Sequence, residues 1–144
     1  MKEVDSFLID KILTDHELLE GPIFCEVDYF KFVYNLEKRI SYRYNRNSII
    51  MIITMRRKSQ ISYEQIESAA KNLKDILWHA LRKSDLVTIW NENQIIVLLI
   101  NIEEKHFKTV TKRIEQKFTD SNDNELFDID ITHRNIYKTQ NVVR

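Results

Sequence analysis

The sequence predicts an α+β domain in which an antiparallel sheet packs against helices. Three segments carry apolar residues at three- and four-residue steps, which is typical of amphipathic helices, and runs typical of strands lie between them. In chain order the elements read helix, strand, helix, strand, strand, helix, strand. We therefore expect a sheet of about five strands flanked by helices, with two neighbouring strands joined directly as a hairpin.

Length and composition fit a single globular domain. The chain has 144 residues, of which 43% are hydrophobic and 31% charged, so it can bury one sizeable core but is too short for two ordinary domains. Residues 1–20 are expected to form an N-terminal helix or arm. The dipeptide Gly21-Pro22 marks the start of the domain, which should span 21–137, and residues 138–144 are expected to be a frayed tail.

The first half of the domain is predicted to run helix, strand, helix. The first helix is expected from Asp28 to Tyr44, and the β-branched run from Ser48 to Met55 predicts a central strand that is covered on both faces. The second helix should run from Tyr63 to Lys83, with Ser62 as its N-cap and Gln65 completing a capping box. In the first helix we expect Tyr29, Val33, Leu36, Ile40 and Tyr44 to face the core, and Lys31, Glu37, Lys38 and Arg39 to face mostly outward.

The second half begins with a predicted hairpin. Strands are expected at Leu86–Trp90 and Ile95–Ile100, joined by a tight polar turn. A third helix should follow from Glu103 to Phe118, and then a polar loop at 120–124. Alternating apolar residues from Phe127 onward predict a last, half-exposed strand.

Charge and residue usage exclude several classes of function. Lys plus Arg and Asp plus Glu are 22 each, so no overall field favours nucleic acid or an anionic membrane. No apolar run reaches the roughly 20 residues that a membrane helix needs, and no signal-peptide layout is present, which predicts a cytoplasmic protein. The one glycine of the chain, Gly21, excludes a glycine-rich phosphate loop. The one cysteine, Cys25, is expected to be a small packed residue.

The segment from Arg82 to Leu99 resembles the catalytic hairpin of diguanylate cyclases. In that family Arg-x-x-Asp is followed, after five residues, by Gly-Gly-Asp/Glu-Glu-Phe and an apolar strand. Together with a helix beginning at 23–26 and the strand at 48–55, the resemblance to this (GGDEF) domain covers about residues 21–118, and at most up to 137. It is nearest to a divergent group of such domains in bacterial regulatory proteins. The resemblance implies a ferredoxin-like, nucleotide-cyclase architecture.

The resemblance also implies that the catalytic groups are missing. Active members hold two divalent cations between an Asp of the central strand and the third residue of the hairpin motif, because cations must neutralise the charge on the transferred phosphoryl group. Those positions fall here on or near Thr54 and on Asn93, and a hydroxyl and an amide are poor ligands for magnesium. The catalytic acid becomes Gln94, and the two glycines become Asn91 and Glu92. We therefore expect a pseudoenzyme with no cofactor and no metal.

Two functions of an inactive domain remain open. The first is a protein-interaction module in bacterial signalling, whose partner would be a regulatory protein or a second copy of the chain. The alternative is a cyclic di-GMP receptor, because Arg82 and Asp85 stand at the spacing of the family's inhibitory site, where Arg would grip a phosphate and Asp a guanine edge. In the plainer interpretation Arg82 is a solvated helix end and Asp85 merely starts a strand.

Other residues give weaker indications. The aromatic candidates for an interaction surface are Tyr42, Tyr44, Trp78 and Trp90. A basic corner that could contact nucleic acid would consist of Arg39, Arg43, Arg46, Arg56, Arg57 and Lys58, but the neutral total charge argues against nucleic-acid binding. The four histidines show no ligand spacing.

Overall fold

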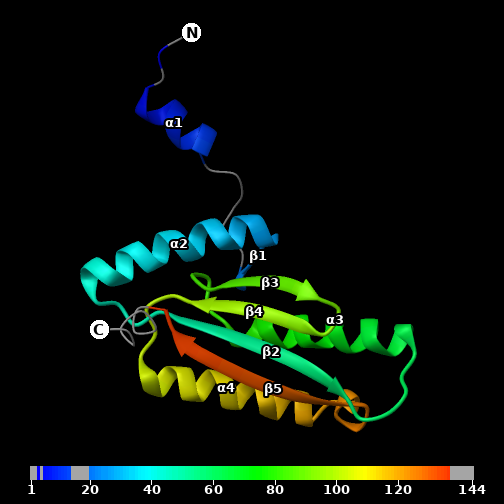
Figure 1. The fold of residues 1–144 in the computed structure, drawn as a ribbon. Coiled ribbons are helices and arrows are strands. Elements are labelled where there is room, and N and C mark those ends of the chain that lie inside the picture. The colour runs from blue at the N-terminus through cyan, green and yellow to red at the C-terminus, as the bar shows by residue number, and fades with distance from the viewer. Residues whose placement is uncertain (1–2, 4, 14–19, 137–144) are drawn as a thin grey trace.

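A five-stranded mixed sheet forms the centre of the molecule (Figure 1). The computed structural model describes residues 3, 5–13 and 20–136. The sheet order is β1-β3-β4-β2-β5; β1 pairs parallel with β3, and the other neighbours are antiparallel. The strands are β1 (Ile23–Phe24), β2 (Ile49–Arg57), β3 (Leu86–Asn91), β4 (Gln94–Leu99) and β5 (Phe127–Asn135).

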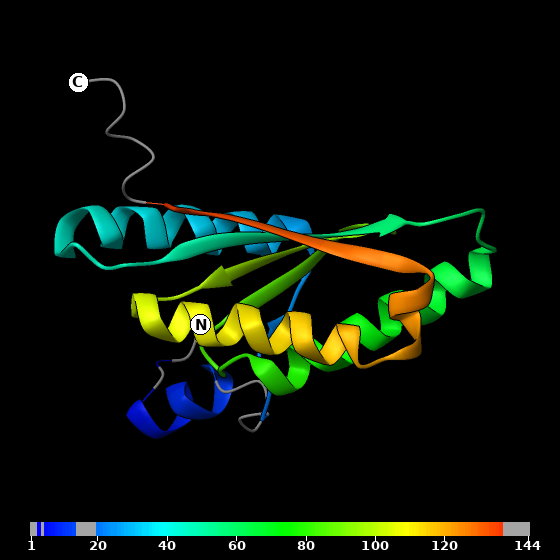
Figure 2. The same ribbon diagram turned by 90° about the horizontal axis from the view of Figure 1, so that it is seen from below.

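Helices cover both faces of this sheet. The helices are α1 (Ser6–Leu13), α2 (Val27–Tyr44), α3 (Tyr63–Ala80) and α4 (Glu104–Thr119), and a short 3-10 helix, η1 (Asn122–Glu125), lies in the predicted loop. Figure 2 shows α2 on one face and α3 with α4 on the other. The predicted α+β architecture is therefore confirmed.

The central strand β2 is buried on both faces, as its sequence predicts. Met51, Ile53 and Met55 point into the larger core beneath α3 and α4, whereas Ile50 joins a smaller cluster under α2. Because side chains alternate along a strand, one apolar run supplies both cores. The last two residues of the strand, Arg56 and Arg57, are exposed.

The start of α3 follows the predicted capping box. The backbone N–H of Gln65 donates to Ser62 Oγ at 3.2 Å, and the Gln65 side chain accepts from the backbone N–H of Ser62 at 2.9 Å. The helix ends at Ala80 and not at Lys83, because Leu81 is extended and residues 82–85 form a turn into β3.

Two expectations about the first helix are wrong. Residues 23–26 do not begin it: Ile23 and Phe24 form β1, where Ile23 N–H donates to the carbonyl of Asp85 at 2.9 Å. The expected inward face is wrong for Tyr29, Leu36 and Tyr44, which are 52%, 46% and 65% exposed, whereas Val33 and Ile40 are half-buried and Val33 packs on the smaller core. Glu37, expected to face outward, is buried. The buried residues of α2 are Phe30, Glu37 and Ser41.

Glu37 is buried because a polar cluster satisfies its carboxylate. Its oxygens accept from the hydroxyls of Ser41 and Ser48 and from the guanidinium of Arg46. Ser48 directly precedes β2, and Arg46 lies in the loop that follows α2. These contacts, rather than an apolar face, fix the end of α2 against the sheet, and a buried carboxylate with such partners is compatible with a stable core.

The only glycine of the sequence allows a close contact. A Cβ atom added at Gly21 would lie 2.4 Å from a ring carbon of Trp78, so no larger residue fits without a shift. Trp78 in turn stacks on Phe24 with ring centroids 6.3 Å apart. This contact places the start of β1 against α3.

Some expectations fall outside the described residues or remain untested. The predicted tail, 138–144, and most of the segment between α1 and Gly21 lie outside the described residues. The division of the chain into an arm, a domain and a tail at residues 20 and 137 remains a prediction. None of the helices in the described parts of the chain is both long and apolar enough to cross a membrane.

We predict that Glu37→Ala lowers the free energy of unfolding by about 3 kcal/mol, because it breaks the buried ion pair with Arg46. This value is at the low end of the range for such pairs, since the Arg46 side chain keeps some contact with water. Urea denaturation measures the change. The matched control is Glu115→Ala, at an exposed position of α4, which should change stability by less than about 0.5 kcal/mol. Equal effects in both variants would contradict the assignment.

Candidate functional site

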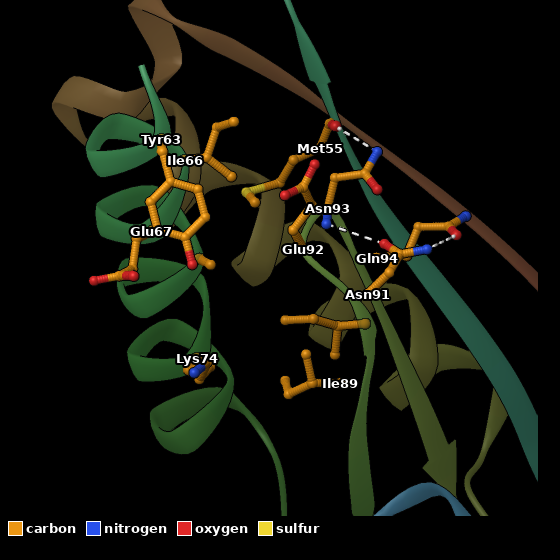
Figure 3. Close-up of a pocket in the computed structure, with 12 residues that line it drawn as sticks. Met55, Tyr63, Ile66, Glu67, Lys74, Ile89, Asn91, Glu92, Asn93 and Gln94 are labelled. Carbon is orange, nitrogen blue, oxygen red and sulfur yellow. Dashed lines mark hydrogen bonds between the residues drawn. The ribbon is translucent and has the colours of Figure 1, made fainter. Parts of the chain in front are cut away.

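A pocket of about 170 Å³ lies between α3 and the β3–β4 hairpin (Figure 3). Its floor is largely apolar, with Met55, Ile66 and Ile89 among the lining residues, and Glu67 and Lys74 line it from α3. The hairpin contributes Asn91, Glu92, Asn93 and Gln94. The four hairpin positions at which the sequence indicated lost catalytic groups therefore line a cavity, whereas Thr54 is not among its lining residues.

The hairpin turn is the tight polar turn that the sequence predicts. Strand β3 ends at Asn91 and β4 begins at Gln94, which leaves Glu92 and Asn93 as the turn. The side-chain oxygen of Asn91 accepts from the backbone N–H of Asn93 at 3.0 Å, and its amide nitrogen donates to the side-chain oxygen of Gln94 at 3.0 Å. The amides thus hold the turn in shape.

Two further amide contacts join this turn to the central strand. The side-chain nitrogen of Gln94 donates to the hydroxyl of Thr54 at 3.2 Å, and that of Asn93 donates to the carbonyl of Met55 at 3.3 Å. A backbone hydrogen bond from Met55 N–H to the carbonyl of Asn93, 2.8 Å long, completes the junction. The structure thereby brings Thr54, Asn93 and Gln94 together.

One exposed ion pair lies where the hairpin turn meets β2, at the junction of Thr54, Met55, Asn93 and Gln94 that we call the hairpin corner. Glu92 lies 3.4 Å from the guanidinium of Arg57, and both side chains are at least half exposed. Such a pair contributes little to stability. Among the described residues no group of three or more His, Cys, Asp and Glu side chains could hold a metal ion.

The pocket includes residues that the sequence reasoning missed. Tyr63, Glu67 and Lys74 stand on α3 at steps of four and seven residues, which is one helical face. That spacing was a readable signal. Which helix face meets the hairpin, however, depends on the packing of α3 on the sheet.

Arg82 and Asp85 pair with each other at the turn between α3 and β3. Asp85 is 1% exposed, and its carboxylate accepts from the backbone N–H of Arg82 at 2.8 Å and from the Arg82 guanidinium at 3.0 Å. The same guanidinium donates to the carbonyl of Ile100 at 2.7 Å. Both carboxylate oxygens are therefore engaged inside the chain, which corresponds to the plainer interpretation of Asp85 as a structural residue.

The remaining candidates divide between exposed and packed positions. Tyr42, Tyr44 and Trp90 are 76%, 65% and 54% exposed, whereas Trp78 is half-buried. Burial raises the pKa of the half-buried Cys25 thiol, which favours its uncharged form and agrees with a packed residue.

The basic corner is largely neutralised by ion pairs. Arg39 and Arg43 are exposed on α2, but the other four bases each pair with an acid. The pairs are Arg46 with Glu37, Arg56 with Asp130, Arg57 with Glu92, and Lys58 with Asp128. This pairing leaves less positive charge for phosphate groups than the sequence suggests.

Comparison with known proteins identifies the fold. No protein-family model and no curated protein matches the sequence. A DGC protein from Thermotoga maritima has a similar structure, with a TM-score of 0.63 and 14% identity over 79% of this chain and 82% of that one. The FimX GGDEF domain from Pseudomonas aeruginosa gives 0.58 and 10%, over 83% and 82%.

A third similar structure is diguanylate cyclase SiaD in complex with its activator SiaC, from Pseudomonas aeruginosa. Its TM-score is 0.55 at 12% identity, and the match covers 75% of this chain but only 44% of that one. The chain therefore has the fold of GGDEF diguanylate cyclase domains, which confirms the resemblance at the level of architecture. Identities this low do not transfer activity.

We predict that Asp85→Ala lowers the free energy of unfolding by about 3 kcal/mol, because it removes the acceptor that holds the Arg82 turn and the start of β3. Chemical denaturation is the measurement. Lys83→Ala, an exposed change in the same turn, serves as control and should be nearly neutral. A stable Asp85→Ala protein would show that this carboxylate is not structural.

Proposed function

We propose that the chain is a catalytically inactive GGDEF-like domain that acts as a protein-interaction module in bacterial signalling, in the cytoplasm. Two parts of this proposal have separate support. Inactivity rests on the chemistry of the hairpin corner, and the interaction role rests on the exposed apolar surface of α2.

The amide contacts at the hairpin carry the first part. Asn93 and Gln94 each turn an NH₂ group toward an oxygen of β2. In a magnesium site, those oxygens would face a cation and the hairpin would supply ionised carboxylates. Here hydrogen-bond donors occupy the place of the positive charge, so the corner is satisfied without a metal.

The pocket itself is also unsuited to a nucleoside triphosphate. Glu92 at the turn would repel phosphate groups. Glu67 on α3 adds a second acid to the pocket lining, against the single basic residue of that lining, Lys74. No glycine in this region lets a phosphate approach the backbone, since the chain's only glycine is Gly21.

The interaction role is supported by apolar surface that the fold leaves uncovered. Tyr29, Phe32 and Leu36 on α2 are 52%, 66% and 46% exposed, and grouped apolar side chains on a surface favour a partner. The similar structure of SiaD was obtained in complex with an activator protein. That complex supports the idea that a domain of this fold can act through protein contacts.

Cyclic di-GMP reception through Arg82 and Asp85 remains the alternative, but the contacts of these residues do not favour it. A guanine edge would have to replace hydrogen bonds that Asp85 already makes. We expect titration calorimetry with cyclic di-GMP to give no binding heat. A saturable heat that disappears in Arg82→Ala would instead establish the receptor function.

We predict that the purified chain forms no cyclic di-GMP from GTP with Mg²⁺ or Mn²⁺, because no carboxylate stands at Thr54, Asn93 or Gln94 to bind the cations or take the proton. Chromatographic detection of product is the assay, and an active diguanylate cyclase is the positive control. Product made in proportion to protein concentration would overturn the proposal.

A gain of metal binding tests the same corner in the opposite direction. The triple variant Thr54→Asp, Asn93→Glu, Gln94→Glu should bind Mn²⁺ at least about tenfold more tightly than the wild type, since it places carboxylates where the amides converge. Electron paramagnetic resonance of free Mn²⁺ measures the affinity. An equal number of acids placed at neutral, exposed positions of α4, as Thr109→Asp, Gln116→Glu and Thr119→Asp, is the control for added charge.

A further inference from the structure

A second cavity, of about 220 Å³, lies between α2 and the sheet, and we call it the α2 cavity. On β3 it is lined by Thr88 and Trp90, whereas Ile89 and Asn91 line the pocket beside α3. Because side chains of a strand point alternately to the two faces of a sheet, the two cavities lie on opposite faces. The α2 cavity is therefore separate from the hairpin corner.

The α2 cavity contains a buried hydroxyl without a partner. Thr88 is 1% exposed, and its side-chain oxygen accepts and donates no hydrogen bond within the described chain. The other buried polar side chains of the described residues are all hydrogen-bonded, namely Glu37, Ser41, Ser48, Thr54 and Asp85. A buried hydroxyl that lacks a partner is unfavourable, so Thr88 calls for a polar group that enters the cavity.

The walls of the α2 cavity suit a flat apolar group. Ile52 and Ile96 of the sheet are half-buried, and Tyr34 faces them from α2. Trp90 is 54% exposed at the side of the cavity, which leaves much of its ring free to pack against a second ring. Figure 2 shows α2 on this face of the sheet and both α3 and α4 on the other, so this face is the less covered of the two.

The charged residues of the α2 cavity are both basic. Lys31 reaches it from α2 and Arg134 from β5, and no acidic residue of the described chain is among the lining residues. Neither base forms an ion pair with another described residue. Asp130, on the same strand as Arg134, pairs instead with Arg56. The two bases are therefore available to an anion, and a guanidinium can hold a carboxylate through two parallel hydrogen bonds.

The volume of the α2 cavity limits the ligand to one small ring system. An apolar cavity of about 150 Å³ holds benzene, whereas pockets for drug-sized ligands begin at roughly 300 Å³. At about 220 Å³ the α2 cavity lies between these values. It has room for one or two fused rings.

We propose that the α2 cavity binds a small aromatic carboxylate. The ring lies on the apolar floor beside Trp90, a polar atom of the ring hydrogen-bonds with the Thr88 hydroxyl, and the carboxylate pairs with Lys31 and Arg134. This inference goes beyond the proposed function, because the site uses neither the hairpin corner nor the outward side of α2.

Titration calorimetry of the full chain with indole-3-carboxylate tests the site. We expect saturable binding of one ligand per chain. Indole has the ring without the charge, and cyclohexanecarboxylate has the charge without an aromatic ring. Each should bind at least about tenfold more weakly than indole-3-carboxylate, because each lacks one of the two recognised features.

Two substitutions test the polar contacts. Arg134→Gln should weaken binding at least about tenfold, whereas Arg39→Gln, at an exposed base of α2 outside the cavity, should leave it unchanged. Thr88→Val keeps the shape of the side chain and should weaken binding about fivefold. Its urea midpoint should not fall, because the hydroxyl that is lost had no partner in the free protein.

Nuclear magnetic resonance locates the ligand within the chain. The chain has two tryptophans, so the side-chain N–H signal of Trp90 should shift on titration while that of Trp78, which packs beside Gly21, stays in place. Trp90→Phe assigns the two signals.

Several results would overturn the aromatic carboxylate site. These are the absence of binding heat, equal affinity for cyclohexanecarboxylate, equal affinity in Arg134→Gln, or a shift of the Trp78 signal alone. Indole that binds as tightly as indole-3-carboxylate would also overturn it, since the cavity would then suit an apolar side chain of a protein partner. None of these results bears on GTP turnover, so the proposed inactivity is tested independently.

Discussion

Burial of β2 on both faces is the constraint on which the rest of the structure depends. The strand pairs with β4 on one side and with β5 on the other, and its alternating side chains fill both cores. Because both faces of this run are apolar, its register is limited by its two ends: Ser48 before it donates to the buried Glu37, and Arg56 and Arg57 at its end are exposed. That register sets Thr54 opposite Gln94 and Asp130, and so places the hairpin turn against the end of the strand.

The elements that the sequence predicts well are those whose signal is local. The β2 run, the hairpin and the Ser62–Gln65 capping box each depend on residues a few positions apart, and the structure reproduces them. The two-residue strand β1 is too short to have a period, and it exists only because its backbone pairs with β3. Sequence patterns do not contain such pairing.

Helix α2 shows a different limit. It carries apolar residues on two sides, so periodicity alone cannot decide which side meets the sheet. The choice is made by Glu37, whose partners include Arg46 and Ser48 beyond the end of the helix. At the candidate site the same division appears. The hairpin residues were identified through the resemblance to the diguanylate cyclase hairpin, but the side of α3 that completes the pocket follows from helix packing, and the engagement of Asp85 follows from its contact with Arg82.

The polar cluster around Glu37 also bears on why α2 suits a partner. Buried hydrogen bonds at its C-terminal half and the packing of Phe30 nearer its start fix the helix against the sheet, so its outward residues stand on a rigid support. A single inward face would be enough for folding, and exposed aromatic residues on the other side favour aggregation unless something covers them. Phe32, at 66% exposed, makes no contribution to either core. Phe32 is therefore an exposed aromatic side chain on a fixed helix, and the proposed interaction role accounts for its position.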